Sequence, residues 1–187
     1  MSLQGIIIIA VGLSMISFSM AFLSSFFKCQ DLPGTLKISF FQAAFQAAMY
    51  TLGWLLSLSF KAWLSQMAWP LVIFILVLLG LKMLLVSRKA KPAEKAFDLS
   101  QFRILIGVSL AASINTFIIG LAMGLINVDL IPAMPIIALA SFVLSILGVI
   151  LGKVSGNVKY SQLAEAIGGF LIIFIGIMLM VQYINLI

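Results

Sequence analysis

The sequence predicts an all-α membrane protein with six transmembrane helices, arranged as two inverted three-helix repeats with both termini outside. Hydrophobic residues make up 64% of the 187 residues and charged residues only 9%, whereas soluble domains are about 45–50% apolar and about 25% charged. The mean hydropathy is +1.27. Six apolar runs are long enough to cross a bilayer, which takes roughly 20 residues. This composition excludes a soluble enzyme, a nucleic-acid-binding module and a disordered linker.

The apolar runs predict the helices in order. The first three are expected at about residues 3–27, 36–60 and 69–86, and the second three at about 102–126, 131–151 and 163–184. Pro33 and Gly34 are expected to break the first connection, and Pro132 and Pro135 lie at the start of the fifth helix, where proline costs least. The expected domains are a first repeat (1–87), a charged linker (88–101) and a second repeat (102–187). The runs do not alternate in polarity as a membrane barrel requires.

Lysine and arginine are distributed unevenly between the two sides of the predicted bundle. The side that holds both termini carries one of them, Lys61. The other side and the helix ends facing it carry the remaining basic residues: Lys28, Lys37, Lys82, Arg88, Lys89, Lys91, Lys95, Arg103, Lys153 and Lys159. Because positive residues mark cytoplasmic loops, we expect the linker 88–101 in the cytoplasm and both termini outside.

Two segments, one in each half of the chain, resemble each other. Residues 14–18 read Ser-Met-Ile-Ser-Phe and residues 113–117 read Ser-Ile-Asn-Thr-Phe. Each half has three predicted helices, an odd number, so the second half would enter the membrane from the opposite face. Inverted-topology repeats are common in secondary transporters, with a site near mid-membrane. A chance likeness between two serine-containing helices is the alternative.

Small residues recur at helical spacing and predict where the helices pack, because they let backbones approach closely within a membrane. The fifth helix carries Ser141, Ser145, Gly148, Gly152 and Gly156, and the fourth carries Ser109, Ser113, Thr116, Gly120 and Gly124. Packing is the preferred interpretation for most of them, since a helical hydroxyl can return its hydrogen bond to its own backbone.

Three amides lie inside the predicted helices. Gln42 and Gln46 lie one turn apart in the second helix, and Asn115 lies about 100° round the fourth helix from its small-residue stripe. A buried amide needs hydrogen-bond partners. An interhelical hydrogen bond worth about 1 kcal/mol is the favoured interpretation, and a position lining a polar pathway is the other.

The five carboxylates are all predicted away from mid-membrane. Asp31, Glu94 and Asp98 fall in loops, Asp129 at the outer end of the fourth helix and Glu165 in the first turn of the sixth. Intramembrane acids are the usual groups of ion and proton pathways, and manganese and magnesium prefer carboxylate, carbonyl and water oxygen. The predicted membrane interior therefore offers amides and hydroxyls but no fixed negative charge. The ten methionines could form a soft-metal path, but methionine is an ordinary filler of apolar space.

The chain resembles the bacterial manganese efflux pumps of the MntP type along nearly its whole length. The likeness is carried, in order and at family spacing, by residues 12–18, 45–54, 79–83, 109–120 and 164–169. The resemblance implies a six-helix inverted repeat and the secondary efflux of a divalent cation of the manganese type.

The resemblance also implies where the metal site of such a pump would lie. The family carries acids at positions that are uncharged in this chain: Ile16 before Ser17 in the first helix, Asn115 before Thr116 in the fourth, and Val86 after the third-helix motif. The family's proline after the second-helix methionine is Tyr50, whereas Gln46 and Glu165 match. An uncompensated charge in a low-dielectric site costs several kcal/mol. Of the two matching positions in the first and fourth helices, the one at Ile16 is apolar, so half of this pseudo-symmetric site offers a cation no compensating charge.

We therefore expect a multi-pass protein of the bacterial cytoplasmic (inner) membrane that transports a divalent cation or another small solute by alternating access. The residues expected to line its pathway are Ser14, Ser17, Gln46, Ser113, Asn115 and Thr116, with Asn115 and Gln46 as candidate metal ligands. The sequence has no nucleotide-binding loop, so the membrane potential or a proton gradient is expected to drive export. The alternative is a non-transporting membrane subunit or scaffold that has lost the cation site.

An enzyme is not expected, because the chain has no histidine and a single cysteine, Cys29, at a helix end without a neighbouring base. No resident cofactor is expected, and Mn²⁺ enters only as transported cargo. The expected partners are the lipid bilayer and the transported cation or solute, but no nucleic acid. A homo-oligomer and a membrane-protein partner are both open alternatives.

Overall fold

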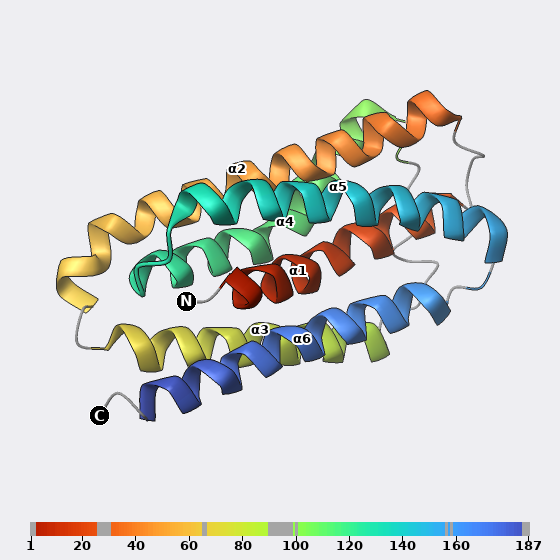
Figure 1. Cartoon of the computed structure of the whole chain (residues 1–187). Coiled ribbons are helices and arrows are strands. Elements are labelled where there is room, and N and C mark those ends of the chain that lie inside the picture. The colour runs from red at the N-terminus through yellow and green to blue at the C-terminus, as the bar shows by residue number, and fades with distance from the viewer. Residues whose placement is uncertain are drawn as a thin grey trace.

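The computed structural model describes residues 3–25, 31–64, 67–89, 99, 101–155, 157 and 159–184. The described residues form helices throughout: α1 (Leu3–Ser24), α2 (Leu32–Leu64), α3 (Ala68–Lys89), α4 (Phe102–Leu125), α5 (Leu130–Ser155) and α6 (Lys159–Ile184). Figure 1 shows them as one bundle in which successive helices alternate in direction, so that α1 begins and α6 ends at the same end. The predicted all-α architecture is confirmed.

The helix boundaries differ from the predicted ones at the polar ends of the apolar runs. α2 begins at Leu32, so the expectation that Pro33 and Gly34 break the connection is wrong. Both residues lie in its first turn, where the N–H that proline lacks has no helical partner. α6 begins at Lys159, so Glu165 lies beyond the first turn that the sequence predicted. The interior of the predicted linker, residues 90–98 and 100, and Gly156 lie outside the described residues.

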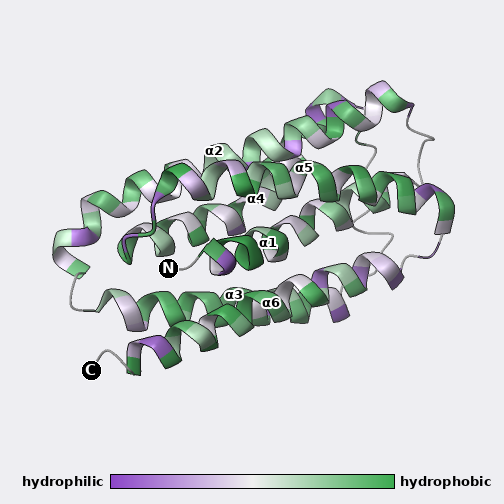
Figure 2. Ribbon diagram, in the orientation of Figure 1, coloured by the Kyte–Doolittle hydropathy of each residue, from purple (hydrophilic) through white to green (hydrophobic). Residues whose placement is uncertain are grey.

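Among the described residues, five helices are long and apolar enough to cross a membrane: α1, α3, α4, α5 and α6. Figure 2 shows hydrophobic residues along nearly the whole length of the helices, with hydrophilic residues gathered mostly toward their ends. α2 is the longest helix, at 33 residues, but its buried face carries Gln42, Gln46 and Ser57. These polar residues lower its hydropathy, and they lie on the side that faces other helices instead of lipid.

Helices from the two halves of the chain pack against each other. α1 packs on α5 and α6, α4 packs on α2 and α3, and the remaining large contacts join α2 to α5 and α3 to α6. If α1, α2 and α3 are exchanged with α4, α5 and α6 in that order, the α1–α5 pair becomes α4–α2 and the α1–α6 pair becomes α4–α3. The α2–α5 and α3–α6 pairs are unchanged by this exchange. Figure 1 shows α1 and α5 side by side and running in the same direction.

Glycines make the closest of these approaches. Gly148 of α5 lies against the carbonyl oxygen of Phe18, and Gly53 of α2 lies against that of Phe117. A Cβ atom at either glycine would collide with the facing backbone. Phe18 and Phe117 end the two similar segments of the sequence, so the likeness between the halves extends to what each segment contacts. The prediction that Gly148 is a packing position is confirmed.

Candidate functional site

A cavity of about 160 Å³ lies between α1, α3, α4 and α6. Its lining residues are Ile16, Met20, Lys82, Met83, Val86, Ala111, Ala112, Asn115 and Glu165. The volume has room for several water molecules. The three positions that the family resemblance assigns to acids, Ile16, Val86 and Asn115, therefore come together in one cavity from three different helices.

Lys82 brings a positive charge to this cavity. It lies seven residues before the end of α3 at Lys89, or about 10 Å along the helix axis. Its Nζ donates a hydrogen bond to Oδ1 of Asn115 at 3.0 Å. The side chain is exposed, and its long flexible stem gives the ammonium freedom to turn away from the cavity.

Glu165 brings the negative charge. It is only 5% exposed, and its Oε1 accepts a hydrogen bond from Oγ of Ser19 at 2.8 Å. Ser19 Oγ also shares a hydrogen bond of 2.6 Å with Ser161 Oγ. Ser19 therefore joins the Glu165 carboxylate of α6 to α1, and Ser161 of α6 bonds the same serine hydroxyl.

The formal charges of Lys82 and Glu165 cancel within the lining. No group of three or more His, Cys, Asp and Glu residues that could hold a metal ion occurs in the described part of the chain. A divalent cation stripped of water would meet one carboxylate, one amide oxygen and a competing ammonium.

A second polar cluster lies where α1, α2 and α5 meet. Nε2 of Gln46 donates to Oγ of Ser17 at 2.8 Å, and Oγ of Ser141 donates to the same oxygen at 3.0 Å. One or two turns away, Ser39 Oγ donates to Ser145 Oγ at 3.1 Å. The members are fully or almost fully buried, so this cluster joins three helices and does not open into the cavity.

Some buried polar atoms near these contacts have no hydrogen-bond partner within the described residues. They are both amide atoms of Gln42, Oε1 of Gln46, Oγ of Ser109 and Oγ1 of Thr116. An unsatisfied buried polar group costs about 1–3 kcal/mol, so these side chains of α2 and α4 are less well satisfied than the cluster around Ser17.

The structure divides the six residues predicted to line one pathway. Asn115 lines the cavity, Ser17 and Gln46 form the interhelical cluster, and Thr116 is buried beside α2. Oγ of Ser14 donates to the Ala10 carbonyl at 2.6 Å and Oγ of Ser113 donates to the Leu110 carbonyl at 2.9 Å. The last two hydroxyls therefore bond only their own helices in the contacts that the structure shows.

Two residues of the cavity, Lys82 and Glu165, are not among the site residues expected from the sequence. Lys82 was counted among the basic residues that set the orientation, and Glu165 was placed at a helix end. The available signal was their position: each lies about 10 Å inside its helix, and an ionisable residue within a membrane span is a candidate functional residue by default.

Comparison with known proteins gives a consistent result. The family described as "Putative manganese efflux pump" matches residues 29–180. "Putative manganese efflux pump MntP" of Desulfitobacterium hafniense (strain Y51) is 31% identical, over 95% of this chain and 94% of that protein. The protein of the same name from Methanothermobacter thermautotrophicus is 32% identical over 99% of each chain, and that from Acetivibrio thermocellus is 30% identical over 100% of this chain and 94% of its own. No solved structure matches the chain.

Proposed function

The chain belongs to the manganese efflux pump family, and we propose that it exports a small cation across the cytoplasmic membrane by alternating access. The observation that carries the proposal is the meeting of Ile16, Val86, Asn115 and Glu165 in one cavity of a multi-pass membrane protein. The relatives are named as manganese pumps, so Mn²⁺ is the first cargo to test.

The proposed topology has six membrane-spanning helices, including α2, in two inverted repeats (1–87 and 102–187) joined by a cytoplasmic linker (88–101). Supporting it, Gly148 of the second half meets the Phe18 carbonyl of the first, just as Gly53 of the first half meets the Phe117 carbonyl of the second. Gly80 and Gly169 likewise each face the other's carbonyl oxygen between α3 and α6. The excess of basic residues on one side supports a cytoplasmic linker and external termini.

In the proposed mechanism, the cation enters the cavity partly hydrated. Glu165 supplies the negative charge, and the Asn115 amide oxygen replaces a water once the Lys82 ammonium has left it. One carboxylate and one amide hold a cation weakly, which favours release on the far side. The membrane potential or a proton gradient drives export.

Efflux from reconstituted vesicles tests this function. Proteoliposomes loaded with Mn²⁺ should release it faster than protein-free vesicles, and Asn115→Ala and Glu165→Gln should slow the release. Ser14→Ala is the matched control, because the Ser14 hydroxyl bonds only its own helix backbone in the structure. Release from wild-type vesicles at the rate of protein-free vesicles would overturn Mn²⁺ export.

The replacement of acids by Ile16 and Val86 favours a second candidate function, a membrane subunit that no longer transports. Its test is purification in mild detergent, where a stable stoichiometric partner together with absent flux would support it. Gly148 is unsuitable for probing such an interface, because it packs inside the bundle against Phe18. Leu139, exposed on the outer face of α5, is a better position.

A further inference from the structure

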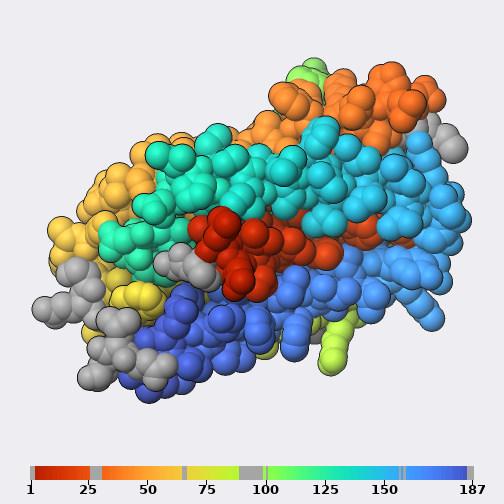
Figure 3. Space-filling model, viewed as in Figure 1, coloured from red at the N-terminus to blue at the C-terminus, as the bar shows by residue number. Residues whose placement is uncertain are grey.

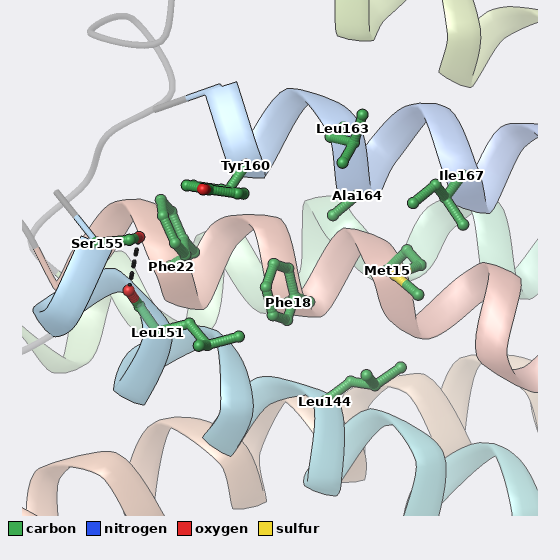
Figure 4. A pocket seen from close by; sticks show the side chains of 10 residues that line it. All are labelled: Met15, Phe18, Phe22, Leu144, Leu151, Ser155, Tyr160, Leu163, Ala164 and Ile167. Carbon is green, nitrogen blue, oxygen red and sulfur yellow. Dashed lines mark hydrogen bonds between the residues drawn. The ribbon is translucent and has the colours of Figure 1, made fainter. Parts of the chain in front are cut away.

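A groove of about 390 Å³ lies between α1, α5 and α6, outside the cation cavity. Figure 4 shows its lining: Met15, Phe18, Phe22, Leu144, Leu151, Ser155, Tyr160, Leu163, Ala164 and Ile167. α1 supplies the floor, and α5 and α6 supply the walls. Nearly all the lining side chains are hydrocarbon, so the groove suits an apolar occupant.

The groove exists because α5 and α6 both pack extensively on α1 and have at most slight contact with each other in the described residues. Gly148 draws α5 onto the Phe18 carbonyl, whereas Gly12 and Gly168 draw α6 onto another side of α1. Figure 3 shows α1 between α5 and α6 on one face of the molecule. The fold therefore holds the two walls apart although they are consecutive in the chain.

The groove has a polar end and an apolar end. Figure 4 shows Tyr160 and Ser155 at one end and Met15 and Ile167 toward the other. At the polar end, the exposed Lys159 is the first residue of α6, directly before Tyr160. Tyrosine and lysine at helix ends are typical of the membrane–water interface.

The length of the groove matches one leaflet of a bilayer. Phe22 and Met15 lie seven residues apart on α1, which is about 10 Å, and Leu144 and Ser155 lie eleven residues apart on α5, which is about 16 Å. Half of the roughly 30 Å hydrocarbon core is about 15 Å. An acyl chain entering beside Tyr160 would reach the depth of Met15.

We propose that the groove binds one acyl chain of an anionic phospholipid, with the phosphate beside Lys159 and Tyr160. Lys159 supplies the charge that distinguishes an anionic head group from a zwitterionic one. Met15 and Ala164 lie next to Ile16 and Glu165 in sequence, so the lipid tail supports the helices whose other faces line the cation cavity. The inference concerns lipid binding and stands whether or not Mn²⁺ is the cargo.

Thermal unfolding of the purified full-length protein in detergent tests the proposal. Saturating phosphatidylglycerol should raise the unfolding temperature by about 5 °C, and phosphatidylcholine should raise it much less. Ala164→Leu, which fills the groove, should abolish the difference between the two lipids. Lys159→Gln should lower the effect of phosphatidylglycerol to that of phosphatidylcholine.

Ala140→Leu is the matched control. Ala140 lines a different apolar hollow, between α1 and α5, and its replacement should leave the lipid difference intact. Equal stabilisation of the wild type by both lipids would overturn the proposal, as would an undiminished difference in Ala164→Leu. If Ala164→Leu does not fold, native mass spectrometry of the wild type decides, because phosphatidylglycerol should remain bound after phosphatidylcholine has dissociated.

Discussion

Replacing Lys82 with glutamine should tighten the binding of a divalent cation. The Lys82 ammonium lies 3.0 Å from Oδ1 of Asn115, the oxygen that the cation would use. A divalent ion at a normal distance beyond that oxygen would lie about 5 Å from the ammonium. Their repulsion at this separation is about 2 kcal/mol at the dielectric constant of water and about 7 kcal/mol at an effective value of 20.

The lower figure applies, because Lys82 is exposed and can turn outward when the cation arrives. A gain of about 2 kcal/mol corresponds to roughly 20- to 30-fold tighter binding. Isothermal titration of Mn²⁺ into the purified protein measures it, with Lys61→Gln as a control in the last turn of α2. An unchanged or weaker affinity in Lys82→Gln would show that the ammonium does not compete with the cation, whereas Lys82→Arg should bind like the wild type.

Three further predictions concern the cavity and the packing of the helices. Glu165→Gln removes the cavity's carboxylate and should weaken Mn²⁺ binding at least about tenfold, a loss of about 1.4 kcal/mol, in the same titration. Ile16→Asp combined with Asn115→Asp should strengthen Mn²⁺ binding over the wild type, because it adds two carboxylates to one cavity; unchanged binding would place the metal elsewhere. Gly53→Ala should destabilise the protein by about 1–3 kcal/mol, because its Cβ meets a backbone carbonyl. Gly107→Ala, with nothing within 4 Å of the new Cβ, should leave the unfolding temperature unchanged or raise it.

The fold was predictable because long runs of apolar residues make up most of the sequence. Each helix follows a run of hydrophobic residues, and the glycine pattern of the fifth run indicated the face that packs on α1. The helix ends were less predictable, because a helix extends into polar residues wherever its backbone can still pair. Pro33 shows the difficulty: proline also marks breaks, and only the start of α2 at Leu32 shows that it lies in the first turn.

The site was only partly predictable. Asn115 stood out because an amide in hydrocarbon needs a partner, and it does line the cavity. Its separation from Ser17 and Gln46 depends on how α1 and α4 are rotated about their axes, which spacing along one helix does not give. Lys82 was not expected in the site because counting basic residues by loop assigns it to a helix end. Glu165 was not expected there because the sixth apolar run predicts a helix start at about residue 163, whereas α6 begins at Lys159.

The crosswise pairing of the helices has a consequence for how the protein is made. α1 has only slight contact with α2, and its main neighbours, α5 and α6, are the last to be synthesised. The glycine-lined surfaces of the first half therefore lack their packing partners in the bilayer until the second half has been synthesised. A chain that stops after α3 would expose those surfaces to quality-control proteases. The two halves, expressed as separate polypeptides, would be stable only when they are produced together.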